Sequence, residues 1–152
     1  MSLPEEIGNL SKLKRLDLTN NRLEYLPPGF GKLQLLSDLL VKDNLLIELP
    51  YEVSTMTGLT SIYAANNRIS ELTFGISMMR ELLQIDVSNN QIGSLLPPLS
   101  HLKLSSLKID HNNLTFEDIA ASKLPDDVNY FDSYDFYYRY QGDVKLSSNE
   151  FA

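Results

Sequence analysis

The sequence predicts an α/β solenoid, in which short repeats stack in a row and each repeat contributes one strand to a parallel sheet. Leucine recurs every 23 residues, at Leu13, Leu36, Leu59 and Leu82. The same frame follows each of them, with apolar residues at positions 1, 4, 6, 11, 14, 18 and 21 and asparagine at position 9. One such unit cannot bury its apolar face alone, so the repeats must stack to form a core.

The first six positions of each repeat alternate apolar and polar residues, which is typical of a half-buried strand. We expect these strands to run parallel, because each connection carries the chain around one turn of the solenoid. Two apolar columns should fill the core. They are Leu16, Leu39, Ile62, Ile85 and Leu107, with Leu18, Val41, Ala64, Val87 and Ile109 beside them.

The asparagine at position 9 predicts a ladder of hydrogen bonds along the stack. Its side-chain amide can bond backbone groups left unpaired where each strand bends away. The ladder residues are Asn21, Asn44, Asn67, Asn90 and, after one deletion, Asn112. The second half of each repeat contains prolines such as Pro27 and Pro50 and few strong helix formers, so we expect an extended or 3₁₀ convex side.

The repeats divide the chain into two parts. Residues 3–12 match the second half of a repeat, full repeats follow from 13 to 103, and a fifth begins at Leu104. We expect 1–114 to be a repeat domain with a truncated N-terminus, since a polar first unit is missing. Residues 115–152 should form a non-repeat, aromatic C-terminal cap, in which Thr115 caps a turn with Asp118 three residues later.

The frames L-x-x-L-x-L-x-x-N-x-L and L-P-x-x-x-x-x-L resemble leucine-rich repeats of the 23-residue type. This resemblance covers residues 3–114 and implies a horseshoe with its parallel sheet on the concave face. The passage at 112–119, with Y-Q-G-D-V at 140–144, resembles the exit from the repeats in surface-exposed leucine-rich-repeat proteins of Bacteroidetes bacteria. That second resemblance implies a bacterial protein of the cell surface, and it implies no functional residue.

Composition limits the partners. The net charge of −7 and the isoelectric point near 4.7, without a basic stripe, argue against nucleic acid. No apolar run of 18 residues exists, so we expect no membrane insertion. Cysteine is absent, which excludes disulfides, thiolate metal sites and cysteine nucleophiles but leaves the redox compartment open. We favour an extracellular or cell-surface location over the cytoplasm.

The outward positions 3, 5, 7 and 8 of the repeats should form the binding face. Its middle combines Leu40, Tyr63 and Ala65, which we expect to be exposed next to one another. Polar and charged residues surround them, namely Asp17, Lys42, Asp43, Asn66, Asp86 and Asn89. An apolar centre inside a polar rim is typical of a protein-binding patch, although single exposed apolar residues also occur on ordinary surfaces.

Catalysis finds little support in the sequence. The histidines are His101 and His111, and we expect His111 to diverge from the adjacent Asp110. No nucleophile elbow or glycine-rich phosphate loop is present, so we expect no enzyme and no cofactor. An acidic cluster in the tail favours a solvated loop over a calcium site, because the EF-hand spacing is missing. Its members are Asp126, Asp127, Asn129, Asp132 and Asp135.

The sequence therefore predicts a non-enzymatic module that binds a protein or an extended surface ligand through its concave face. The alternative is a repeat array that regulates or targets a larger signalling or effector enzyme. The oligomeric state is undetermined, and self-association through the uncapped N-terminal end stays open.

Overall fold

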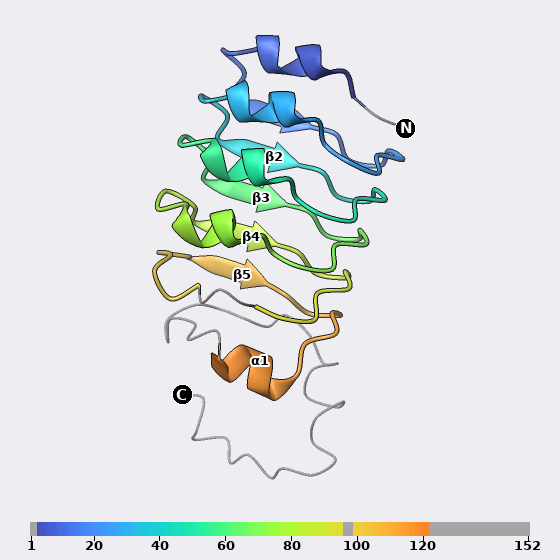
Figure 1. Ribbon diagram of the computed structural model, residues 1–152, viewed down its shortest axis with the longest axis vertical. Helices are drawn as coiled ribbons and strands as arrows, with labels where there is room; N and C mark the ends of the chain where they lie inside the picture. The colour runs from blue at the N-terminus through green and yellow to red at the C-terminus, as the bar shows by residue number, and fades with distance from the viewer. Residues whose placement is uncertain (1–2, 96–98, 122–152) are drawn as a thin grey trace.

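The computed structural model describes residues 3–95 and 99–121. Its five strands form one parallel sheet in chain order (Figure 1). They are β1 (Arg15–Asp17), β2 (Asp38–Leu40), β3 (Ser61–Tyr63), β4 (Gln84–Asp86) and β5 (Ser106–Lys108). Each strand pairs with the next at the same repeat position, so that Leu39 lies opposite Leu16 and Ile62. The predicted solenoid with a parallel sheet is confirmed.

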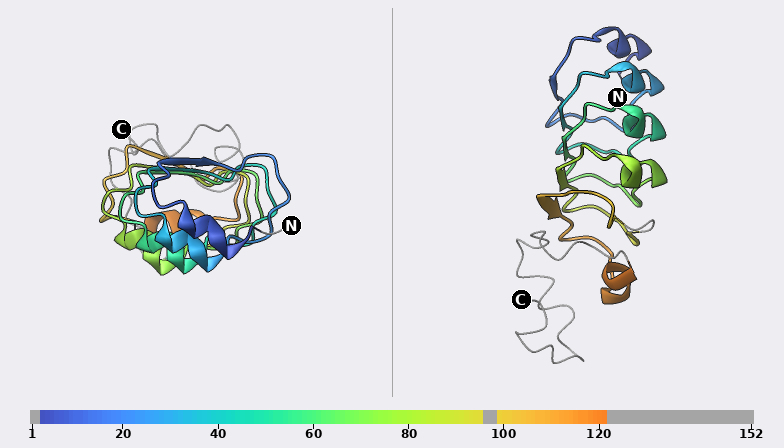
Figure 2. Two further views of the ribbon diagram at one scale, coloured as in Figure 1. Left: turned by 90° about the horizontal axis from the view of Figure 1, so that it is seen from above. Right: turned by 90° about the vertical axis from the view of Figure 1, so that its left-hand side faces the viewer.

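Short 3₁₀ helices stack on the side opposite the sheet (Figure 2). They are η1 (Glu5–Asn9), η2 (Pro28–Lys32), η3 (Tyr51–Thr55) and η4 (Phe74–Met78). An extended residue precedes each helix, with φ between −73° and −62°. The first three of these residues are prolines, whose ring fixes φ near this value. The predicted 3₁₀ convex side is therefore confirmed.

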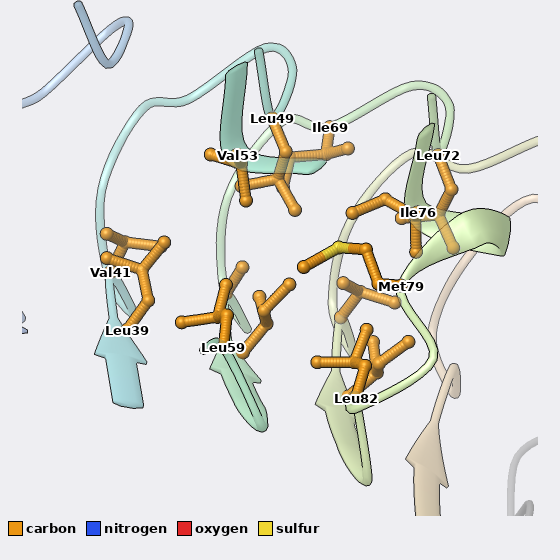
Figure 3. Packing of buried hydrophobic residues seen from close by; sticks show 14 of the residues in the cluster. Leu39, Val41, Leu49, Val53, Leu59, Ile69, Leu72, Ile76, Met79 and Leu82 are labelled. Carbon is orange, nitrogen blue, oxygen red and sulfur yellow. The ribbon is translucent and has the colours of Figure 1, made fainter. Parts of the chain in front are cut away.

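The core fills the space between the sheet and the 3₁₀ helices (Figure 3). Both predicted columns lie in it, and from the second repeat to the fifth their side chains are at most 2% exposed. At the N-terminal end, Leu16 and Leu18 are only partly buried. No strand pairs with the outer edge of β1 among the described residues, so a neighbouring strand flanks these two leucines on one side only.

Close stacking of the helices depends on a glycine in η2. A Cβ atom at Gly29 would lie 2.3 Å from the carbonyl oxygen of Glu5, a distance that real Cβ atoms do not adopt. The Gly29 N–H donates to Oε2 of Glu5 at 2.7 Å. The half-repeat before β1 is thereby joined to the first full repeat.

Helix α1 (Phe116–Ala121) follows the last strand and lies on the side of the 3₁₀ helices (Figure 2). The Asp118 N–H donates to the Thr115 hydroxyl at 3.2 Å, and the Thr115 N–H donates to the Asp118 carboxylate at 2.8 Å. This reciprocal capping confirms the turn predicted at Thr115. The rest of the predicted cap and the acidic cluster at 126–135 lie outside the described residues. None of the described helices has the length and apolar character needed to cross a membrane.

Candidate functional site

The candidate site is the sheet face, which we define as repeat positions 3, 5, 7 and 8 on the side of the sheet away from the core. Leu40 and Tyr63 lie next to each other at its centre, because β2 and β3 pair them in register. Both side chains are half-buried. Asp17 pairs with Leu40 on the other side and remains exposed. Hydrogen bonds from the Thr19 side chain and, to a smaller extent, from the Thr19 backbone N–H lower the pKa of Asp17.

The expectation that Ala65 is part of the exposed patch is wrong. Ala65 is only 5% exposed, and its carbonyl accepts the Asp43 N–H at 3.0 Å. This hydrogen bond holds the backbone at Ala65 against the second repeat, and the single methyl group of alanine is too short to extend from there into solvent. The apolar centre of the sheet face therefore consists of Leu40 and Tyr63.

A charged group lies over this centre. Nζ of Lys42 donates to Oδ2 of Asp86 at 2.8 Å and lies 5.5 Å from the centroid of the Tyr63 ring. The Ser88 hydroxyl donates to the other carboxylate oxygen at 2.7 Å. The Tyr63 hydroxyl donates to Oε1 of Gln84. Lys42, Tyr63, Asp86 and Ser88 thus form one network that spans three repeats.

The network changes the expectation for Asp86, which we predicted to be an exposed residue of the polar rim. Asp86 is 7% exposed, so it is a buried charge with partners and not a rim residue. Burial raises the pKa of its carboxyl group, but the hydrogen bonds from Lys42 and Ser88 outweigh burial and leave the pKa below its usual value. Asp86 therefore stays ionised beneath Lys42.

The residues at position 8 have a backbone role that sequence reasoning missed. All five adopt the left-handed conformation, with φ between 52° and 57°. Asparagine, aspartate and histidine tolerate this conformation better than other residues with a side chain. The recurrence of asparagine, aspartate and histidine at position 8 was the sequence signal that could have revealed this backbone role. It comprises Asn20, Asp43, Asn66, Asn89 and His111.

Three of these position-8 residues were predicted to belong to the polar rim. Asp43, Asn66 and Asn89 are exposed at the edge of the sheet face. Nδ2 of Asn66 donates to Oδ1 of Asp43 at 2.7 Å. Because the backbone already favours these residue types, their identity is no separate indication of a ligand.

The expectation that Asp110 and His111 diverge is also wrong. Nδ1 of His111 lies 2.8 Å from Oδ2 of Asp110. The left-handed backbone at His111 breaks the alternation of a strand, so adjacent side chains reach the same side. In the described part of the chain, no group of three or more histidine, cysteine, aspartate or glutamate side chains is placed to hold a metal ion.

The ladder asparagines connect each repeat to the one before it. Oδ1 of Asn67 accepts the Leu46 N–H at 3.0 Å, and Nδ2 donates to the carbonyls of Val41, Ala64 and Ala65. Asn44, Asn90 and Asn112 repeat this pattern. Nδ2 of Asn21, in the first repeat, donates to carbonyls of its own repeat. The ladder holds the turns from which the sheet face is built.

A second apolar group lies on the 3₁₀ side and was not predicted. Tyr51 of η3 and Phe74 of η4 occupy the same repeat position, and Met78 lies one turn further along η4. Their exposed fractions are 63%, 65% and 63%, which makes them more exposed than Leu40 and Tyr63. A test of the sheet face must therefore include these residues as the competing surface.

Comparison with known proteins agrees with the geometry. A family model described as Leucine Rich Repeat matches residues 12–33 and 81–102. The crystal structure of an internalin from Listeria monocytogenes superimposes with a TM-score of 0.63 at 23% sequence identity. The match covers 82% of this chain and 43% of the internalin chain, so the chain spans less than half of that protein. No curated protein matches this chain.

Proposed function

We propose that this chain, which folds as a leucine-rich-repeat solenoid, binds a protein or an extended surface ligand through its sheet face and performs no catalysis. The observation that carries the proposal is the pair of Leu40 and Tyr63, two large side chains side by side on adjacent strands within a polar surround. A central aromatic side chain that becomes fully desolvated on binding is typical of an interaction hot spot.

The scaffold supports the same proposal. The strands are short and are fixed by the asparagine ladder, so the side chains of the sheet face are held in place before a ligand arrives. A preorganised surface loses little conformational entropy on docking.

The location is a further part of the proposal. We propose that the protein is bacterial and acts at the cell surface, as the resemblance of 112–119 and 140–144 to Bacteroidetes surface proteins implies. Leucine-rich-repeat solenoids also occur in internalins, as the structural comparison indicates. Proteolysis of intact cells of the source organism tests this point. Cleavage of the chain without cell lysis supports it, and complete protection contradicts it.

The binding test begins with an array of purified proteins and glycans probed with the wild-type chain. Each ligand found is then titrated against two double variants. Leu40→Ala/Tyr63→Ala changes the sheet face, and Tyr51→Ala/Phe74→Ala removes comparable side chains from the 3₁₀ side. We expect Tyr63→Ala alone to cost at least ~2 kcal/mol of binding free energy.

The matched pair decides between the two surfaces. The proposal requires that the Leu40/Tyr63 variant loses the ligand while the Tyr51/Phe74 variant retains it. The reverse result would move the binding surface to η3 and η4. Circular dichroism of both variants must match the wild type before either result is interpreted.

A further inference from the structure

We propose that the partner of the sheet face presents a basic side chain, which takes the place that the Lys42 ammonium occupies between Tyr63 and Asp86. This inference rests on the proposed function, because it states the chemistry of the partner for the same face. Three features of the sheet face support it: a cation already lies in the site, this cation is easily displaced, and the surroundings are acidic.

A cation already occupies the site. Lys42 Nζ contacts the Asp86 carboxylate at 2.8 Å and lies over the Tyr63 ring at 5.5 Å from its centroid. A carboxylate beside the face of an aromatic ring attracts cations through both charge and the ring quadrupole. The Ser88 hydroxyl fixes the carboxylate from the other side at 2.7 Å. The residues therefore form a site for an ammonium or guanidinium group, and Lys42 occupies it from within the chain.

A partner can displace the Lys42 ammonium from this site. Its side chain is 35% exposed, whereas the Asp86 side chain beneath it is 10% exposed. A partly exposed lysine pair is weak, because water and salt compete for the ammonium. An arginine from a partner should bind the site more strongly than Lys42 does, since its planar guanidinium can stack on Tyr63 and bind the carboxylate with two hydrogen bonds. Displacing Lys42 would also uncover the Tyr63 ring, which the proposed function requires for contact.

A partner carboxylate that binds Lys42 instead is disfavoured. Such a partner would leave the Asp86 carboxylate buried without its cation, which is unfavourable. It would also approach a surface with more acidic than basic groups. The acidic residues of the sheet face are Asp17, Asp38, Asp43, Asp86 and Asp110, and the basic ones are Arg15, Lys42 and Lys108. Charge complementarity therefore favours a basic partner.

The test uses the whole chain and three blocked peptides: tri-arginine, tri-citrulline as its uncharged analogue, and tri-glutamate. Binding is followed by the backbone amide signals of β3 in two-dimensional NMR spectra. We expect tri-arginine to shift the signals of Ser61–Tyr63, and we expect tri-citrulline and tri-glutamate to leave them unchanged.

Two variants with matched controls identify the site. Lys42→Met removes the resident cation and keeps the aliphatic stem, so tri-arginine should bind about two- to fivefold more tightly than to Lys32→Met, which changes the net charge equally on η2. Tri-arginine should no longer shift the β3 signals of Asp86→Asn. It should still shift those of Glu71→Gln, in which the changed residue is exposed and lies away from the strands. If Asp86→Asn does not fold, the comparison of Lys42→Met with Lys32→Met tests the inference by itself.

Three results would overturn the inference. One is the absence of β3 shifts with tri-arginine, and another is equal affinity of the Lys42→Met and Lys32→Met variants. The third is binding of tri-glutamate that Lys42→Met abolishes, which would indicate an acidic partner. None of these results affects the proposed function, which fails if the Leu40/Tyr63 variant retains a ligand found on the array.

Discussion

Lys42 reaches across strand β3 to Asp86, with 2.8 Å between its Nζ atom and the carboxylate, and so joins the second repeat to the fourth. In a solenoid each repeat normally contacts only its immediate neighbours. This ion pair is therefore a longer connection along the sheet face. It also lies over Tyr63, at the centre of the surface that we propose for binding.

The ion pair predicts a pH dependence of stability. Because hydrogen bonds from Lys42 and Ser88 outweigh burial, the folded-state pKa of Asp86 is below its usual value. Such a group stabilises the fold above the unfolded-state pKa, and this stabilisation is lost as pH falls through the folded-state pKa. The wild type should therefore exceed Asp86→Asn in unfolding free energy most clearly near neutral pH, and the difference should shrink below about pH 4. Urea denaturation of both proteins across this range measures it. A difference independent of pH would contradict the assignment.

The asparagine ladder predicts unequal costs for the same substitution. Asn67→Ala removes four hydrogen bonds, among them the acceptor of the buried Leu46 N–H, and should lower the unfolding free energy by about 2–4 kcal/mol. Asn21→Ala is the matched control, because its exposed amide donates to two carbonyls of its own repeat. It should cost less than about 1 kcal/mol. Equal losses in chemical denaturation would show that the ladder does not act between repeats.

Thr73 marks a place where the protein can be stabilised. It occupies the repeat position of Pro4, Pro27 and Pro50, and its φ of −62° is one that proline adopts. Its hydroxyl oxygen is buried and has no hydrogen-bond partner in the described structure. Thr73→Pro should raise the unfolding free energy by about 0.4–1 kcal/mol, chiefly by restricting the unfolded chain.

Thr73→Val separates the two contributions, since it removes the hydroxyl without fixing φ. Thermal and chemical denaturation of both variants provides the measurement. A proline variant less stable than the valine variant would mean that the fourth repeat cannot accept the Leu-Pro step of the earlier repeats.

The aromatic cap that the sequence predicts for 115–152 gives an expected effect of removing 122–152. Leu107 in β5 and Ile109 just after it belong to the last repeat of the core, and both are at most 2% exposed. We expect the deletion to lower the melting temperature or cause aggregation, because an uncapped stack exposes apolar surface. A truncated protein that stays monomeric and melts at the temperature of the full chain would refute the role of these residues as a cap.

The sequence by itself determined the solenoid, its strands and its buried columns. A repeat with a fixed period leaves one way to bury Leu39, Ile62 and Ile85 together, and it places them in register on neighbouring strands. The same regularity located Leu40 and Tyr63 as neighbours on the sheet face. It also predicted the capping of the turn by Thr115 and Asp118, because that contact depends on residues only three positions apart.

Only the tertiary structure decided how the polar residues of the face are used. The contact between Lys42 and Asp86 joins residues in different repeats, and it depends on side-chain rotamers that a repeat pattern does not specify. Ala65 and Asp86 are buried because the side chains around them extend further from the sheet than they do. The left-handed turn at position 8 likewise arises from the path of the chain around each repeat. Periodicity fixes which residues are neighbours, but the packing of individual side chains fixes which of them remain available to a partner.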